Sequence, residues 1–325
     1  MEPDERHPPF CIVLAAGDGT RLAPLVRRLH GDERPKQFAV LKGERSLLQD
    51  TMNRMTAVAP PARTVVVVSD RHRYLAEEQL GGGAAPEVVC QPRNVGTGSG
   101  ILLPLAHVVA RSPQATVVIT PSDHHFHRPG RFTSKMSYAI DAAAAAPDGV
   151  CLLAVDAEGP SEDLGWIVSG APLPARPGAS TIERFVEKPS LPVARRLYDG
   201  GGLWNTFVMV GAAASFWRLA REHMPTQTRL LERYLPAIGT HLERRVLEGI
   251  YAELEPADWS RDVLAHARGL AVVSVGGSGW SDWGTPARLF ESLNATPELR
   301  ALERRLQGAP GVGANGGASN SLAAP

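Results

Sequence analysis

Short apolar runs alternate with amphipathic stretches along the first half of the chain. The apolar runs are continuous, as expected of strands covered on both faces, and they predict strands at residues 10–14, 64–69, 86–91, 115–120 and 150–155. Helical patterns lie between them, at residues 47–59, 72–80, 98–111 and 131–146. Strands that alternate with helices predict an α/β fold with a doubly wound, mixed but mostly parallel sheet.

The pattern changes beyond residue 160. Apolar and polar residues alternate at 166–168 and 181–186, which is typical of antiparallel or edge strands. A helical block at 212–249 and a strand at 270–275 follow. We therefore expect a small antiparallel extension that packs on the first sheet.

No long polar linker divides the chain, so we expect one domain over residues 1–307, with halves at 10–160 and 161–307. Residues 308–325 consist almost entirely of Gly, Ala, Ser, Asn and Pro. Such a segment buries too little apolar surface to offset the entropy of ordering it, and we expect a disordered tail.

Composition narrows the classes of function. The chain has 325 residues, of which 43% are hydrophobic, so it can bury a full core. The 34 basic and 34 acidic residues balance, which argues against a nucleic-acid or lipid-surface partner. No apolar run approaches the roughly 20 residues of a membrane span, and the first residues lack the layout of a signal peptide. We expect a cytoplasmic protein whose three cysteines are reduced.

A glycine-rich turn, Gly17-Asp18-Gly19-Thr20-Arg21, follows the first predicted strand. Backbone N–H groups of such a turn can bind a polyphosphate, and Arg21 and Lys36 can add positive charge. Leu22 stands where a dinucleotide-binding turn needs its third glycine, and the Gly-Lys-Ser/Thr of a Walker loop is missing. The turn therefore predicts a nucleoside triphosphate site, the alternative being a tight turn whose glycines only supply positive φ.

Two carboxylates are candidates for a magnesium site. Asp123 follows the strand at 115–120, and Asp282 lies in the segment Gly-Trp-Ser-Asp-Trp-Gly after the strand at 270–275. Carboxylates from two loops, completed by substrate phosphates and water, are a common Mg²⁺ site in phosphoryl chemistry. The alternatives are a turn or helix cap for Asp123, a structural turn for Asp282, and a zinc cluster of Asp123, His124, His125 and His127.

Three further segments carry polar groups at strand ends. Lys188, fixed by the following Pro189, can bind the phosphate of an acceptor as a point charge. Asn205 lies in an apolar strand and needs a partner, either a sugar hydroxyl or a backbone carbonyl. The segment 91–98 opens a helix, and its amides and small residues are suited to binding a base or ribose. The alternative is that it only caps the start of the helix.

Taken in order, these motifs resemble those of the sugar-1-phosphate nucleotidyltransferases, most closely the mannose-1-phosphate guanylyltransferases. The resemblance runs from about residue 10 to residue 293. It rests on Leu-Ala-Ala-Gly-Asp-Gly-Thr-Arg-Leu at 14–22, Pro-Lys-Gln-Phe at 35–38, Leu-Gln-Asp-Thr at 48–51, Pro-Ser-Asp-His at 121–124, Phe-Val-Glu-Lys-Pro at 185–189, Leu-Trp-Asn at 203–205 and Gly-Trp-Ser-Asp-Trp-Gly at 279–284.

The resemblance implies a Rossmann-like, GT-A-type fold in which the first half binds the nucleotide and the second half the sugar phosphate. It implies Arg21, Lys36 and Asp123 as catalytic residues and Mg²⁺ as cofactor, held by Asp123 and Asp282. The implied nucleotide-binding residues are Leu14, Ala15, Ala16, Gly17, Asp18, Gly19, Thr20, Arg21, Gln91, Asn94, Gly96 and Thr97, and the implied substrate-binding residues are Gly165, Glu187, Lys188 and Asn205. The implied substrates are GTP and mannose 1-phosphate.

The chain departs from the family's motifs at three places. Thr-Phe at 206–207 replaces the usual Ser-Gly, and Arg-Asn-Val-Gly-Thr-Gly at 93–98 replaces Gly-Arg-Asn-Thr. Pro-Ala-Asp-Trp-Ser-Arg-Asp at 256–262 is only loosely similar to the family's Ser-Ile-Asp-Tyr. The substrates could therefore be another nucleoside triphosphate, and another hexose phosphate or a cyclitol phosphate. An alternative function is that of a catalytically silent regulator that binds a nucleotide-sugar. An NAD-dependent dehydrogenase is disfavoured, because the third glycine of its turn is missing. We also expect a single-function enzyme, because no β-helix or cupin-like isomerase module follows. The sequence does not determine the oligomeric state, and a homodimer is one possibility.

Overall fold

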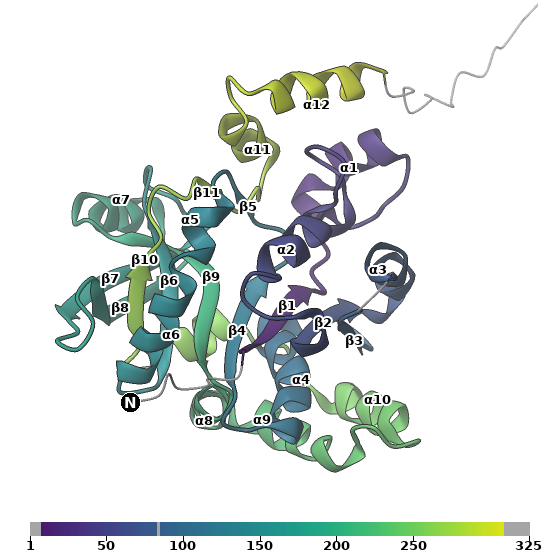
Figure 1. Ribbon diagram of the computed structural model, residues 1–325, viewed down its shortest axis with the longest axis vertical. Coiled ribbons are helices and arrows are strands. Elements are labelled where there is room, and N and C mark those ends of the chain that lie inside the picture. Colours follow the sequence, from purple (N-terminus) through teal and green to yellow (C-terminus); the bar gives the residue numbers. More distant parts are fainter. Residues whose placement is uncertain (1–7, 83–84, 309–325) are drawn as a thin grey trace, which may run out of the picture.

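A nine-stranded sheet forms the centre of the computed structural model, which describes residues 8–82 and 85–308 (Figure 1). The strand order is β3-β2-β1-β4-β9-β6-β10-β8-β7, and β7 also pairs with β9. Its strands are β1 (Phe10–Ala15), β2 (Thr64–Ser69), β3 (Glu87–Gln91), β4 (Thr116–Pro121), β6 (Val150–Asp156), β7 (Gly165–Pro172), β8 (Ala179–Glu187), β9 (Leu203–Ala212) and β10 (Ala271–Ser274). A separate two-stranded ribbon pairs β5 (His125–Phe126) with β11 (Trp280–Ser281).

The sheet is mixed, and the expectation that it is mostly parallel is wrong. Among the described strands, four pairings of this sheet are parallel and five are antiparallel. The reason is β9, which lies antiparallel between β4 and β6, together with the β7–β8 hairpin at one edge. A continuous apolar run shows that a strand is buried but does not show the direction of its neighbour.

Helices cover both faces of the sheet because successive residues of its strands point to opposite sides. In β1, Phe10 and Ile12 belong to one buried cluster, while Cys11 and Val13 belong to another. The first cluster includes side chains of α4 (Gly96–Arg111), α8 (Ala213–His223), α9 (Pro225–Glu232) and α10 (Glu243–Glu253). The second includes side chains of α2 (Leu47–Met55), α3 (Arg73–Leu80), α5 (Pro129–Thr133), α6 (Met136–Ala145) and α7 (Leu191–Asp199).

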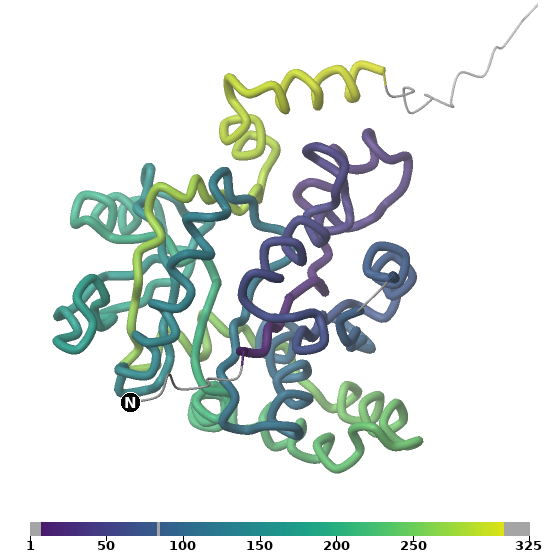
Figure 2. The backbone as a smooth tube through the Cα atoms, viewed as in Figure 1, coloured from purple at the N-terminus to yellow at the C-terminus, as the bar shows by residue number. Residues whose placement is uncertain are grey.

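The last helices of the described chain pack on its beginning. Leu22 and Val26 of the N-terminal segment share a third buried cluster with Trp283, Leu289 and Leu302. Figure 2 shows α11 (Pro286–Ser292) and α12 (Pro297–Gly308) beside α1 (Ala23–His30), yellow against purple. This packing holds the Asp282 loop close to the glycine-rich turn.

Several expected helices are shorter or divided. The helix expected at 131–146 is two helices, α5 and α6, and the block at 212–249 begins as the end of β9 and is then broken at prolines 225 and 236. Proline removes a backbone donor and therefore interrupts an extended helix. Of the tail predicted at 308–325, only Gly308 lies within the described residues, as the last residue of α12. None of the described helices has both the length and the apolar character that a membrane span requires.

Candidate active site

The glycine-rich turn leaves β1 and is held against Lys36 and its neighbour Gln37. Gly19 has a φ of 60°, and a Cβ at this position would lie 2.9 Å from the backbone N of Lys36. Only glycine satisfies both conditions without strain. Gln37 Nε2 donates to the carbonyl oxygens of Ala15 (2.8 Å) and Gly17 (2.7 Å), which fixes the start of the turn.

Lys36 lies at the centre of the site. It opens a short 3₁₀ helix, Lys36–Phe38, and is only 7% exposed. Its ammonium group lies 3.0 Å from Asp123 Oδ2 and donates to the carbonyl oxygens of Asp282 (2.7 Å) and Trp283 (3.3 Å). The structure therefore brings Lys36, Asp123 and Asp282 together, as the strand ends predict.

The β5–β11 ribbon sets the spacing of the two acidic loops. Asp123 lies between β4 and β5, and Asp282 follows β11, so the pairing of Ser281 with His125 aligns them. The ring of His125 also stacks on that of Trp283, with 4.3 Å between ring centroids. Two loops that lie far apart in the sequence are thus both held in contact with the Lys36 ammonium group.

Both carboxyl groups are ionised more readily than usual. Burial and the nearby Asp282 carboxylate raise the pKa of Asp123, whereas Lys36 and His124 lower it by more. The pKa of Asp123 therefore lies below its ordinary value. Burial likewise raises the pKa of Asp282, while Arg288, His124 and Lys36 lower it to a net value below the ordinary one. Two ionised carboxylates at neutral pH are what a divalent cation requires.

The two carboxylates supply oxygen donors, the ligand type that Mg²⁺ prefers. Asp123 uses Oδ2 for Lys36, and His124 Nε2 lies 3.8 Å from its Oδ1. Asp282 uses Oδ1 for Arg288 at 2.8 Å and keeps Oδ2. A Cβ at Gly284 would lie 2.3 Å from Asp282 Oδ2, so glycine is needed to leave this oxygen room. Within the described chain, no group of three His, Cys, Asp or Glu side chains is placed to hold a metal. The site suits a hard cation that takes its remaining ligands from phosphates and water.

Arg288 is a residue that the sequence analysis missed. It lies on α11, donates to Asp282 Oδ1 and to Ser161 Oγ (3.0 Å), and its guanidinium lies 5.3 Å from the ring centroid of Trp204. A single arginine thus joins the Asp282 loop to the loop after β6. An isolated arginine in a helix carries no sequence signal of such a role, because its partners are far away in the chain.

A cavity of about 350 Å³ opens between the glycine-rich turn and α4. Its lining includes eight of the predicted site residues, namely Leu14, Ala16, Gly17, Gln91, Asn94, Gly96, Thr97 and Asp123. The other predicted nucleotide residues do not line this cavity. Ala15 is buried, Gly19 packs on Lys36, and Thr20 is exposed. Asp18 forms an ion pair with Arg71, and the half-exposed Arg21 lies with Nη1 3.3 Å from Asp163 Oδ1.

The segment before α4 is shaped by close packing on a distant loop. Gly96 has a φ of 89°, and a Cβ there would lie 2.2 Å from the carbonyl oxygen of Ala257. The hydroxyl of Thr97 donates to Asp258 Oδ2 (3.1 Å) and accepts from the backbone N of Trp259 (2.8 Å). Glycine at 96 is therefore a packing requirement of the cavity wall.

Eight residues that line the cavity were not predicted as site residues, and two of them, Phe207 and Asp258, stand out. Phe207 lies within a register shift of the β6–β9 pairing, between Asn205 and Val208, and has a φ of 58°, which a bulky side chain rarely adopts. The sequence signal for this position was its departure from the family's Ser-Gly. For Asp258 the only signal was a loose likeness of residues 256–262 to a family segment.

The predicted substrate residues form a cluster next to this cavity without lining it. A Cβ at Gly165 would lie 2.9 Å from Glu187 Oε2 and 3.5 Å from the Cβ of Asn205. Burial raises the pKa of Glu187, Lys188 lowers it and Asp258 raises it, with a net value above the ordinary one. Lys188 is mostly exposed, with its ammonium 3.3 Å from Glu187 Oε1.

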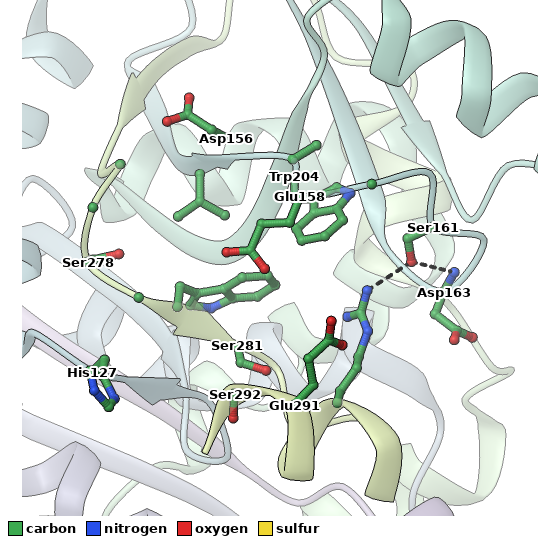
Figure 3. Close-up of a pocket in the computed structure, with 18 of the residues that line it drawn as sticks. His127, Asp156, Glu158, Ser161, Asp163, Trp204, Ser278, Ser281, Glu291 and Ser292 are labelled. Carbon is green, nitrogen blue, oxygen red and sulfur yellow. Dashed lines mark hydrogen bonds between the residues drawn. The ribbon is translucent and has the colours of Figure 1, made fainter. Parts of the chain in front are cut away.

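A second, larger cavity of about 830 Å³ is lined by residues that include Ser281, next to Asp282 in the sequence (Figure 3). Its lining also includes Trp204, Glu158, Asp156, Glu291, Arg288 and Ser161. None of the site residues that the family resemblance implies lines it. Of the two cavities, only the smaller one is lined by the glycine-rich turn and by Asp123.

Comparisons with known proteins identify the family of this chain. The family model described as Nucleotidyl transferase matches residues 10–298. Xanthan biosynthesis protein XanB of Xanthomonas campestris is 29% identical over 283 residues, covering 86% of this chain and 58% of that protein. Mannose-1-phosphate guanylyltransferase of Escherichia coli is 26% identical over 297 residues, covering 89% and 60%. The chain thus spans less than two thirds of the length of these relatives.

Solved structures share the fold. A crystal structure described as mannose-1-phosphate geranyltransferase from Thermus thermophilus matches with a TM-score of 0.75 and 27% identity, covering 89% of this chain and 80% of that one. The inositol-1-phosphate CTP transferase from T. maritima matches with a TM-score of 0.54 and 16% identity, covering 92% and 96%. The α/β fold with a mixed sheet is therefore a nucleotidyltransferase fold.

Proposed function

Because the chain belongs to the nucleotidyl transferase family, we propose that it transfers a nucleotidyl group from a nucleoside triphosphate to a sugar 1-phosphate, releasing pyrophosphate. GTP and mannose 1-phosphate are the proposed pair. The relative named mannose-1-phosphate guanylyltransferase supports this choice, as do the motifs at 35–38 and 203–205. The observation that carries the proposal is that Lys36 contacts both Asp282 and Asp123, and that Asp123 lines the cavity beside the glycine-rich turn.

The proposed reaction needs no covalent intermediate on the protein. An oxygen of the acceptor phosphate forms a bond to the α-phosphorus, and the bond from that phosphorus to the bridging oxygen breaks, with pyrophosphate taking the electron pair. Both reactants are anions, so catalysis consists of aligning them and neutralising their repulsion. The charges available for this are Arg21 and Lys36 for the triphosphate and Lys188 for the acceptor phosphate.

Each remaining residue has a role in binding. Asp123 and Asp282 would hold Mg²⁺, which when bound neutralises charge on the phosphate oxygens. Glu187 and Asn205 face each other across Gly165 and can bind sugar hydroxyls, since the absent Cβ of Gly165 leaves space there. The wall formed by Gln91, Asn94 and Thr97 would contact the base and ribose.

A matrix of nucleoside triphosphates against sugar 1-phosphates, including a cyclitol phosphate, tests this proposal by pyrophosphate release in the presence of Mg²⁺. We expect the highest kcat/KM for GTP with mannose 1-phosphate. Asp123→Asn should lower pyrophosphate release about 100-fold or more, because it removes a charge beside the phosphates. The matched control Asp199→Asn, exposed at the end of α7, should not. Nucleotide-sugar binding without pyrophosphate release from any pair would show a silent binding protein instead.

A further inference from the structure

Lys36 contacts both residues that are proposed to hold the metal, through the carboxylate of Asp123 and the backbone carbonyl of Asp282. An ammonium group has three N–H donors, and the structure gives it three acceptors, namely Asp123 Oδ2 and the carbonyl oxygens of Asp282 and Trp283. The side chain is buried, so water does not compete for these contacts. No donor of this group is left for a phosphate until it leaves its present partners.

The charges around the two carboxylates already balance. Lys36 neutralises Asp123, and Arg288 neutralises Asp282. A divalent cation bound by the two carboxylates would lie close to two positively charged side chains, Lys36 and Arg288. Like charges that lie close together repel strongly in a partly buried site. The site as folded therefore offers little net attraction to a cation alone.

The two positive groups differ in how they can respond. Arg288 contacts Asp282 Oδ1, also donates to Ser161 and lies over the ring of Trp204, so it is held by three elements. Lys36 has a flexible four-carbon stem, and its charged partner among the described residues is Asp123. The group that can move away is Lys36.

We propose that Lys36 is an internal counter-cation that keeps the Asp123–Asp282 site closed to metal until a triphosphate arrives. The triphosphate accepts the ammonium group, Asp123 is released, and metal and nucleotide therefore bind together. This rests on the proposed function for the assignment of Asp123 and Asp282 as metal ligands. The role is distinct from charge neutralisation in the reaction, since it operates before any substrate has reacted.

The test measures Mn²⁺ binding to the nucleotide-free protein by electron paramagnetic resonance, which counts free Mn²⁺. Lys36→Met removes the charge and keeps most of the length of the side chain, and we expect it to bind Mn²⁺ about tenfold more tightly than wild type, or better. Lys42→Met, the same change at a lysine near Glu298, is the matched control and should bind like wild type. Adding Asp123→Asn to Lys36→Met should abolish the gain, which locates the metal.

Mn²⁺ affinities of wild type and Lys36→Met that differ by less than about twofold would overturn the inference. If the methionine variant fails to fold, Lys36→Gln carries the same test, because its amide can still donate to a backbone carbonyl. The result is independent of the proposed reaction, since no substrate is present. If the wild type releases no pyrophosphate but Lys36→Met binds Mn²⁺ more tightly, the proposed function alone is rejected. If the wild type is active but Lys36→Met gains no Mn²⁺ affinity, the inference alone is rejected.

Discussion

Replacing Arg288 by methionine removes the partner of a nearly buried carboxylate. The side chains of Arg288 and Asp282 are 21% and 10% exposed, and Nη1 lies 2.8 Å from Oδ1. Breaking a fully buried pair costs about 3–5 kcal/mol, and we expect about 2–3 kcal/mol here because Arg288 keeps some exposure and Lys36 remains close to Asp282. The methionine retains most of the stem, so the loss reflects the charge and its hydrogen bonds.

The pH dependence separates this charge effect from a packing defect. Arg288 holds the pKa of Asp282 below its ordinary 3.8 in the folded protein, against the effect of burial. The corresponding stabilisation is fully present above the pKa of the unfolded chain and is lost as the pH falls through the lower pKa of the folded state. The difference in unfolding free energy between wild type and Arg288→Met should therefore be largest near neutral pH and smaller below about pH 3.

Urea unfolding followed by circular dichroism at several pH values measures this difference. Arg195→Met, an exposed arginine on α7, is the matched control and should change the unfolding free energy by less than about 0.5 kcal/mol. Arg288→Lys should recover part of the loss, since it restores the charge but not the bond to Ser161. A variant as stable as wild type near neutral pH, or a deficit that is constant across the pH range, would refute the reasoning.

Three further substitutions test the packing of the cavity wall and of the surface. Gly96→Ala should lower the unfolding free energy by about 2–4 kcal/mol, because its Cβ would overlap the carbonyl of Ala257 and φ is positive; urea unfolding checks it. Phe207→Gly should be more stable than Phe207→Leu by about 1 kcal/mol in thermal unfolding, since both lose the ring but only leucine keeps the left-handed strain. Arg244→Met breaks an exposed bidentate pair with Asp70 and should cost less than about 1 kcal/mol; a larger loss would show that this pair is not an ordinary surface contact.

The strands were predictable because their signal is local. Predicted and observed bounds of β1, β2, β3, β4 and β6 agree within one residue at each end. The direction of β9 was not predictable, because pairing with β4 and β6 depends on contacts far along the chain. The β5–β11 ribbon, with two residues in each strand, is too short to show any periodicity.

The centre of the site was predictable for a different reason. Asp123 follows a strand end and Lys36 follows the glycine-rich turn, and groups at the carboxyl ends of neighbouring parallel strands meet at one edge of a sheet. Arg288 could not be found in this way, because it reaches Asp282 from the side of a helix that packs on the N-terminal segment. The partner of Arg21, Asp163, was missed as well, since it lies in a loop without a motif.

Places where the chain departs from the family's motifs contribute to the lining of the cavity. Phe207 lines it, as do Asn94, Gly96 and Thr97 of the segment 93–98, together with Asp258. Lys36 and Asp282, by contrast, match the motifs, contact each other and are not among the residues that line the cavity. Since the proposed transfer step needs the residues that bind phosphate and metal, and the choice of base and sugar needs the cavity lining, we expect this chain to differ from its relatives in substrate preference before it differs in the reaction. The strained backbone of Phe207 favours this view, because strain at a cavity wall persists only where the surrounding structure enforces it.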